Sequence, residues 1–165
     1  VEMVSTGEVA CFGRTFDEAL LKSLIAAGMR LPGKGEAVLI TVGENKEAII
    51  PIARDILAEG YKIYATEHTA QALLENGIEC SPIHKVSEKV NPNILDYIVE
   101  GKIKFVINIP SIKYEAKTRR VMEDEYLIRR KAVEFGIPIV TNLELASALV
   151  KALKNGRGSL KGILS

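Results

Sequence analysis

The 165-residue chain has no tryptophan, and its aromatic side chains are five tyrosines and four phenylalanines. Its charge is balanced as well, since 22 lysines and arginines stand against 21 aspartates and glutamates and leave a formal net charge of +1. Proteins that bind nucleic acid strands combine a cationic groove with stacking aromatics, so this composition excludes that class. A near-neutral chain also lacks the field that draws a protein to a membrane surface.

Long apolar runs and export signals are absent too. No run approaches the ~20 residues of a membrane-spanning helix, and no signal peptide is visible. Cys11 and Cys80 lie far apart and form no metal or redox motif, so we expect free thiols and a cytosolic, reducing location. Because the chain begins at Val1 and not at methionine, we also expect a piece of a longer protein.

The common motifs of catalysis and cofactor binding are missing as well. The chain has no G-x-G-x-x-G, no Walker loop, no G-x-S-x-G elbow and no clustered metal ligands. We therefore expect no cofactor and no metal in this chain.

The remaining pattern alternates short apolar runs with amphipathic ones. Apolar runs such as 37–42 and 104–109 are near-continuous, which is typical of parallel strands covered on both faces. Strands are expected at 37–42, 61–66, 104–109 and 137–142, with a short one inside 78–86, and helices at 16–29, 46–60, 68–77, 91–101, 125–136 and 143–155. The order predicts an α/β fold, a three-layer α/β/α open parallel sheet of about five strands.

The chain length suits one globular domain. We divide the sequence into an N-terminal arm or linker from a preceding domain (1–13), the globular domain itself (14–155) and a C-terminal tail (156–165). A polar loop is expected over 114–121, before the helix at 125–136.

Polar residues gather where the expected strands pass into helices. Thr66 and Thr69 stand three apart after the strand 61–66, and Lys46 occupies the matching place after the strand 37–42. In an open parallel sheet such junctions share one edge, and helix N-termini there favour anions. Thr66 is also a candidate helix N-cap, which leaves Thr69 unexplained by capping. The sequence therefore predicts a site for a small anion such as a phosphate or carboxylate.

Further candidates follow the later strands at the same edge. Lys85 follows the short third strand, Asn108 ends the fourth, with Ser111 just beyond, and Thr141 ends the fifth. His68 is more typical of an exposed first turn, while His84 could close the pocket beside Lys85, which is the better ligand candidate because its charge does not depend on pH near 7. The adjacent arginines 129 and 130 face different ways on a helix, so at most one is expected to point inward.

Carboxylates are scarce at these strand ends, apart from Glu44 and Glu67. A general base is therefore not evident, and the pattern favours binding over catalysis.

Taken together, several motifs resemble one family. The STGEV at 5–9, the ATxxTA at 65–70, the IN at 107–108 and the IRR at 128–130 match, in order and spacing, the methylglyoxal-synthase-like domain at the C-terminal end of the carbamoyl-phosphate synthase large chain. The resemblance extends over about residues 3–155. It implies a regulatory domain with an effector pocket at the carboxyl edge of the sheet.

What the resemblance implies for individual residues can be carried over position by position. Lys46, Thr66 and Thr69 would hold a phosphate, while Lys85 and Asn108 would reach a sugar or base. The parent enzyme would make carbamoyl phosphate for pyrimidine and arginine biosynthesis, using ATP with Mg²⁺ or Mn²⁺. Its synthetase domains and a glutaminase small subunit would be the partners, and the chain alone would not be catalytic.

Two departures bear on the effector. The hydroxyl-rich stretch of nucleotide-binding relatives is replaced by 109–111, Ile-Pro-Ser, which is similar to the N-acetylglutamate-activated type. That type, however, has a tryptophan where this chain has Lys85, and it has further asparagines that are missing here. The resemblance therefore favours a UMP-like nucleotide, with N-acetylglutamate as the alternative.

Two other functions remain open at this stage. A methylglyoxal synthase would use the same phosphate cradle on dihydroxyacetone phosphate, but its Gly-Asp-Gln-Gln stretch is replaced by 110–113, Pro-Ser-Ile-Lys. A subunit-contact module with an empty pocket would instead expose an apolar patch over 143–154.

Overall fold

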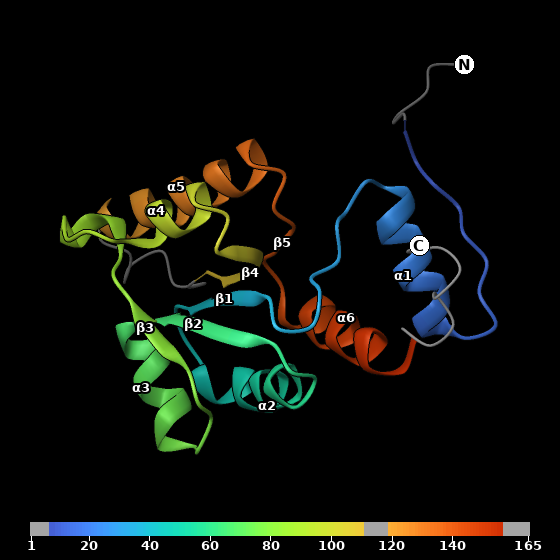
Figure 1. Ribbon diagram of the computed structural model, residues 1–165, viewed down its shortest axis with the longest axis horizontal. Helices are drawn as coiled ribbons and strands as arrows, with labels where there is room; N and C mark the ends of the chain where they lie inside the picture. Colours follow the sequence, from blue (N-terminus) through green and yellow to red (C-terminus); the bar gives the residue numbers. More distant parts are fainter. Residues whose placement is uncertain (1–6, 111–118, 157–165) are drawn as a thin grey trace.

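The computed structural model describes residues 7–110 and 119–156. A sheet lies at the centre, with helices on both of its faces (Figure 1). The elements in chain order are α1 (Phe16–Ala26), β1 (Ala37–Val42), the 3-10 helix η1 (Lys46–Ile49), α2 (Ile50–Ala58), β2 (Lys62–Thr66), α3 (Glu67–Glu75), β3 (Ser81–Ile83), the 3-10 helix η2 (Val86–Glu88), α4 (Ile94–Val99), β4 (Ile103–Ile109), α5 (Arg119–Glu134), β5 (Ile139–Val140) and α6 (Leu143–Gly156).

The five strands form one parallel sheet in the order β3-β2-β1-β4-β5. In the register, Ile40 of β1 pairs with Ala65 of β2 on one side and with Ile107 of β4 on the other. Because all strands run the same way, their carboxyl ends meet at one edge of the sheet. The predicted three-layer α/β/α architecture is confirmed.

Two apolar cores hold the layers together. One core joins the sheet to α2, α3 and α6, and it includes Leu73 and Leu149. The other joins the opposite face to α4 and α5, and it includes Ile98 and Ile128. Figure 1 shows α4 and α5 on one side of the sheet and α2 and α3 on the other, while α1 packs on α6 beyond β5. Leu21 joins α1 to the first core.

Local sequence explains several element boundaries. All six residues of β1 are buried, as its continuous apolar run predicts. Thr15 caps α1, because its hydroxyl oxygen accepts the Glu18 N–H at 3.2 Å. Asn93 begins α4 with a capping box that also involves Asp96.

The helix expected at 46–60 differs from the prediction in its first turn, which is a 3-10 helix. Pro51 has no N–H with which to make the α-helical bond to the carbonyl of Glu47, and that carbonyl instead accepts the N–H of Ile50. The regular α2 therefore starts at Ile50.

Two further boundaries were predicted wrongly. The loop expected over 114–121 is helical from Arg119 onward, and 114–118 lie outside the described residues. Only Ile139–Val140 of the strand expected at 137–142 pairs with β4, and β5 is an edge strand.

Cys11 and Cys80 are both free and half-buried. Within residues 7–110 and 119–156, no helix has the length and apolar composition needed to cross a bilayer.

Candidate functional site

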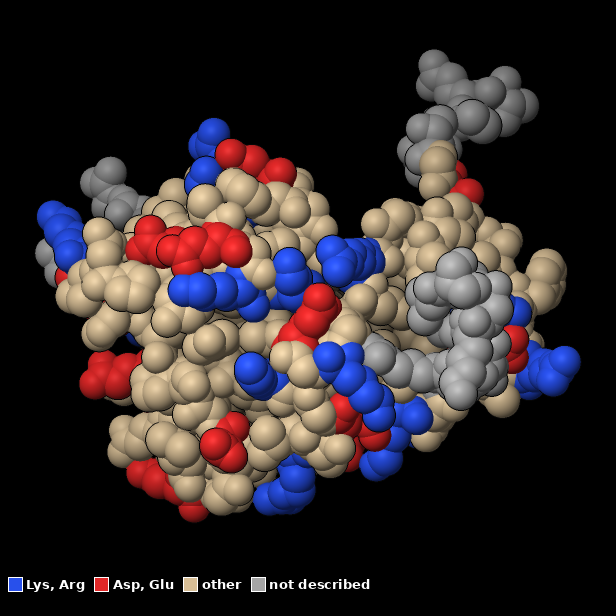
Figure 2. Space-filling view, in the orientation of Figure 1, with Lys and Arg blue, Asp and Glu red and all other residues tan. Residues whose placement is uncertain are grey.

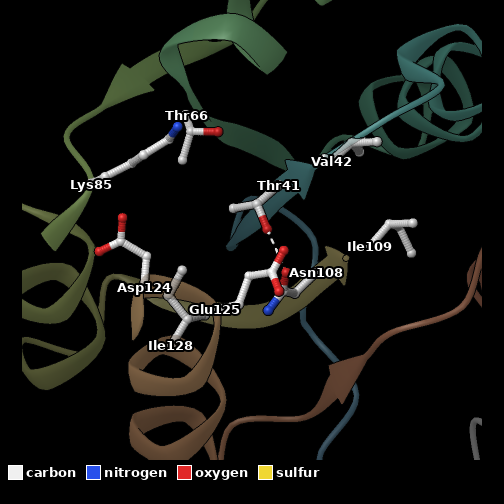
Figure 3. Close-up of a pocket in the computed structure, with 10 residues that line it drawn as sticks. Thr41, Val42, Thr66, Lys85, Asn108, Ile109, Asp124, Glu125 and Ile128 are labelled. Carbon is white, nitrogen blue, oxygen red and sulfur yellow. Dashed lines mark hydrogen bonds between the residues drawn. The ribbon is translucent and has the colours of Figure 1, made fainter. Parts of the chain in front are cut away.

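A pocket opens at the carboxyl edge of the sheet, between the strand ends and α5 (Figure 3). Its empty volume is ≈ 440 Å³, including the open solvent at its mouth. The residues that line it are Thr41, Val42, Gly43, Thr66, Lys85, Asn108, Ile109, Asp124, Glu125 and Ile128. Three of the predicted site residues, Thr66, Lys85 and Asn108, are therefore brought together.

The most distinctive group in this pocket is the amide of Asn108, a residue that is only 1% exposed. Its Oδ1 accepts a hydrogen bond from the Thr41 hydroxyl at 3.0 Å, which fixes the amide (Figure 3). Its Nδ2 is buried and has no hydrogen-bond partner in the part of the chain that the structure describes. An unmade hydrogen bond of this kind costs about 1–3 kcal/mol. The pocket therefore presents an N–H donor suited to an oxygen acceptor of a ligand.

Thr69 supports the pocket from behind and does not line it. The residue is 1% exposed, and its hydroxyl oxygen accepts the Val42 N–H at 3.2 Å. The same hydroxyl lies 3.5 Å from the Val42 carbonyl and 3.4 Å from the Thr66 hydroxyl. These contacts account for its one proton and two lone pairs. In this arrangement Thr69 holds the end of β1, and the predicted ligand contact remains a prediction.

Thr66 occupies the N-cap position of α3, as predicted, but its side chain makes no capping hydrogen bond. The hydroxyl bonds to Thr69 instead. Thr66 is buried, lines the pocket and leads directly into α3. The first-turn N–H groups of α3 add a partial positive charge nearby.

Lys85 supplies the cation of the pocket. Its side chain points across the cavity toward Thr66 in Figure 3. No ion pair or hydrogen bond of its ammonium group is recorded with any described residue. A lysine that forms no ion pair within the described residues and lies beside Thr66 is suited to the anionic group of a ligand.

Lys46 is placed differently from the prediction. Its ammonium donates to the Gly43 carbonyl at 3.1 Å, and the side chain does not line the pocket, although Gly43 does. The lysine thus stabilises the loop after β1. Its role as a direct phosphate contact remains a prediction.

Two carboxylates in the pocket were missed by the sequence analysis. Asp124 and Glu125 line the pocket from α5, not from a strand end. The scarcity of carboxylates at the strand ends therefore does not extend to the whole pocket. Asp124 accepts hydrogen bonds from the backbone N–H of Ser87 at 2.8 Å and from its hydroxyl at 2.6 Å.

The remaining candidates lie elsewhere or cannot be placed. Thr141 is exposed and does not line the pocket, and Ser111 lies outside the described residues. Arg129 is half-buried and Arg130 is exposed, so the two do face different environments, but neither lines the pocket. No group of three or more possible metal ligands was found in residues 7–110 and 119–156.

The surface around the fold carries both charges. Lysines and arginines alternate with aspartates and glutamates over the face in Figure 2, with no extended area of one sign. Any attraction for an anion must therefore come from local groups such as Lys85 and not from a broad field.

A known domain family matches most of this fold. The model of the MGS-like domain family matches residues 48–141, which contain β2, β3, β4, β5 and most of the pocket. The chain belongs to the MGS-like domain family.

Curated relatives of this MGS-like domain are parts of larger enzymes. The C-terminal section of the carbamoyl phosphate synthase large chain of Methanopyrus kandleri is 44% identical over 153 residues, covering 93% of this chain and 27% of that protein. The corresponding section from Methanocaldococcus jannaschii is 39% identical over 153 residues, covering 93% and 24%. The multifunctional protein pyr1-3 of Dictyostelium discoideum is 35% identical over 163 residues, covering 97% and 7%. The chain thus spans at most about a quarter of these relatives.

Solved structures support the fold alone. The crystal structure of methylglyoxal synthase from Elizabethkingia anophelis matches with a TM-score of 0.55 at 16% identity, covering 73% of this chain and 79% of that one. The crystal structure of ForH matches with a TM-score of 0.52 at 18% identity, covering 75% and 82%.

Proposed function

We propose that this MGS-like domain binds a small anionic effector and thereby regulates a carbamoyl-phosphate synthase large chain. One observation carries the proposal: the buried Asn108 amide nitrogen and the Lys85 ammonium belong to the same pocket, and neither has a hydrogen-bond or ion-pair partner among the described residues. A cation and a preset N–H donor on opposite walls suit a ligand with an anionic end and an oxygen acceptor. The similarity to C-terminal sections of carbamoyl phosphate synthase supports such a synthase as the parent enzyme.

The effector we favour is a UMP-like nucleotide. Its phosphate would lie between Lys85 and the first turn of α3, and a carbonyl of its base would accept from Asn108 Nδ2. N-acetylglutamate is the alternative, since it also has carboxylates for Lys85 and an acetyl oxygen for Asn108. Apolar side chains of Val42, Ile109 and Ile128 would contact either ligand.

In this role the chain contributes regulation and not synthesis. ATP with its Mg²⁺ or Mn²⁺ would be held by synthetase domains of the same large chain, and a glutaminase small subunit would supply ammonia, for pyrimidine and arginine biosynthesis in the cytoplasm. The effector must bind two states of the enzyme unequally, and a coupling of about 1–3 kcal/mol would be ordinary.

Calorimetric titration of the 165-residue chain with UMP, and then with N-acetylglutamate, tests the proposal. We expect binding of one of them, weakened at least tenfold by Lys85→Met and by Asn108→Leu. Thr66→Val and Lys46→Ala test two more of the predicted contacts in the same assay. Lys62→Met is the matched control, because Lys62 is exposed at the start of β2, at the far edge of the sheet. Absence of binding for both ligands, or equal losses in Lys85→Met and the control, would contradict an effector site here.

The two carboxylates on α5 support a second candidate, a lyase acting on dihydroxyacetone phosphate. Phosphate elimination needs a proton acceptor beside the substrate, and Asp124 and Glu125 are carboxylates in the pocket wall. Against this role, both oxygens of Asp124 already accept from Ser87. Incubation with dihydroxyacetone phosphate decides the matter, since a lyase would release methylglyoxal and inorganic phosphate, and an effector domain would leave the compound unchanged.

A further inference from the structure

The cation of the pocket lies on a short segment whose position depends on one carboxylate. Lys85 precedes η2, and the backbone before it is held where the His84 carbonyl accepts the N–H of Ile94 at 3.1 Å. On the other side of Lys85, Ser87 is held by Asp124 of α5 through two hydrogen bonds, at 2.8 and 2.6 Å. We call this pair of bonds the Ser87–Asp124 clasp.

Within the described residues, the clasp provides the only recorded hydrogen bonds between η2 and another element. The other bonds of the segment are local: Glu88 N–H donates to the Lys85 carbonyl, Lys89 N–H donates to the Val86 carbonyl, and the Glu88 carboxylate lies 2.8 Å from Nδ1 of His84. A three-residue 3-10 helix has little stability of its own, so an outside anchor determines where its first residues lie. Asp124 is 6% exposed, and a hydrogen bond to a buried carboxylate is among the stronger ones.

The clasp also directs the Asp124 carboxylate to Ser87 and not to the cation beside it. Asp124 and Lys85 both line the pocket, yet no ion pair joins them among the described residues. In Figure 3 the Lys85 side chain runs toward Thr66, while the Asp124 carboxylate lies below the Lys85 backbone. The two recorded hydrogen bonds of the Asp124 carboxylate go to Ser87, and the Lys85 side chain reaches toward Thr66 instead.

We infer that Asp124 is a positioning residue of the effector site, which acts by fixing Ser87 and thereby holding Lys85 over the pocket. The inference takes its ligand from the proposed function, whereas the geometry of the clasp does not depend on that function. It assigns Asp124 no contact with the effector and no proton transfer. Weakening the clasp should make the Lys85 segment more mobile. The affinity for the effector should then fall by no more than the contribution of Lys85 to binding.

The first test needs no ligand. Backbone ¹⁵N relaxation in wild-type protein, Ser87→Ala and Asp124→Asn reports order at Lys85 and Ser87. We expect order parameters near the ~0.85 of rigid backbone in the wild type and values falling toward ~0.6 in both variants. Ile128, on the same helix as Asp124, should be unchanged. An equally ordered Lys85 in both variants would overturn the inference, whatever the protein binds.

The second test separates positioning from a general structural role. Ser87→Ala and Asp124→Asn should each weaken binding of whichever of UMP and N-acetylglutamate the wild type binds by about tenfold, the change expected from one charge-assisted hydrogen bond. In a Lys85→Met background the same changes should alter affinity less than twofold. Equal losses in both backgrounds would overturn the inference.

A matched control uses the same helix. Glu134→Gln removes a carboxylate from the exposed end of α5, where Glu134 pairs with Lys131 at 3.0 Å, and it should change neither relaxation at Lys85 nor affinity. If the wild type binds neither ligand, the proposed function fails, while the relaxation measurement still decides the positioning role.

Discussion

Thr41 donates a 3.0 Å hydrogen bond to the side-chain oxygen of Asn108, and the two residues are register partners on β1 and β4. Both are buried polar residues at the carboxyl ends of central strands. The bond leaves the amide nitrogen of Asn108, a residue that lines the pocket, buried and without a partner among the described residues. The fold thus keeps an unsatisfied donor at its centre, and that cost is consistent with a site prepared for a ligand.

The first prediction concerns Thr41→Val, which keeps the shape of the side chain and removes its hydroxyl. The Asn108 oxygen then loses its partner inside the protein, so the free energy of unfolding should fall by about 1–3 kcal/mol. Urea denaturation measures this loss. Thr141→Val, at an exposed position, is the control and should change stability by less than about 0.5 kcal/mol. A similar result for both variants would contradict a stabilising role of the bond.

The second prediction concerns Thr41 and Asn108 together. Asn108→Leu removes an unsatisfied donor together with the acceptor for Thr41, so the double variant Thr41→Val/Asn108→Leu should be more stable than Thr41→Val alone. Effector binding should nevertheless be lost in both variants that carry Asn108→Leu. Urea denaturation and calorimetry on the four proteins of the cycle measure the two effects. Additive losses of stability would show that the two side chains do not interact.

The strands were predictable because their pattern is local. The apolar run 37–42 predicts β1 with its observed bounds, since a strand buried on both faces needs apolar residues at every position. The 3-10 turn before α2 was not predicted. It follows from the missing N–H of Pro51 and from the left-handed backbone conformation of Asn45, which precedes the turn. Propensity alone describes that segment as one helix.

The site was predictable only in part, for a related reason. Parallel topology brings the strand ends together, and that rule correctly gathers Thr66, Lys85 and Asn108. Asp124 and Glu125 come from the side of a helix, and the sequence offers no signal for which face of that helix meets the pocket. Lys46 was predicted to contact the ligand, but its ammonium group donates a hydrogen bond to the neighbouring Gly43 carbonyl instead.

The third prediction concerns Thr69, whose hydroxyl accepts the Val42 N–H. Thr69→Val should leave that buried N–H without its partner and lower the free energy of unfolding by about 1–3 kcal/mol. Hydrogen exchange at the Val42 amide should accelerate in the same variant. Thr69→Ser is the control: it keeps the hydroxyl and loses one methyl group, so Val42 exchange should change much less. Equal exchange rates in the two variants would mean that Thr69 does not hold the end of β1.

The last prediction concerns pH and Glu18 on α1. The hydrogen bond from Lys22, at 2.7 Å, and that from the backbone N–H of Arg14, at 2.9 Å, lower the pKa of the Glu18 carboxyl below its ordinary value of 4.5. A carboxyl with a lowered pKa in the folded state stabilises the protein above the unfolded-state pKa, and this contribution is lost as the pH falls through the folded-state pKa.

Glu18→Gln should therefore be less stable than the wild type at pH 7, and the difference should shrink as the pH falls below 4.5. Urea denaturation between pH 7 and pH 3 at low salt measures the difference. Glu47→Gln removes an exposed carboxylate from η1 and serves as the control, with a small difference at every pH. A Glu18→Gln difference that stayed constant down to pH 3 would show that the ionised carboxylate of Glu18 is not what stabilises the start of α1.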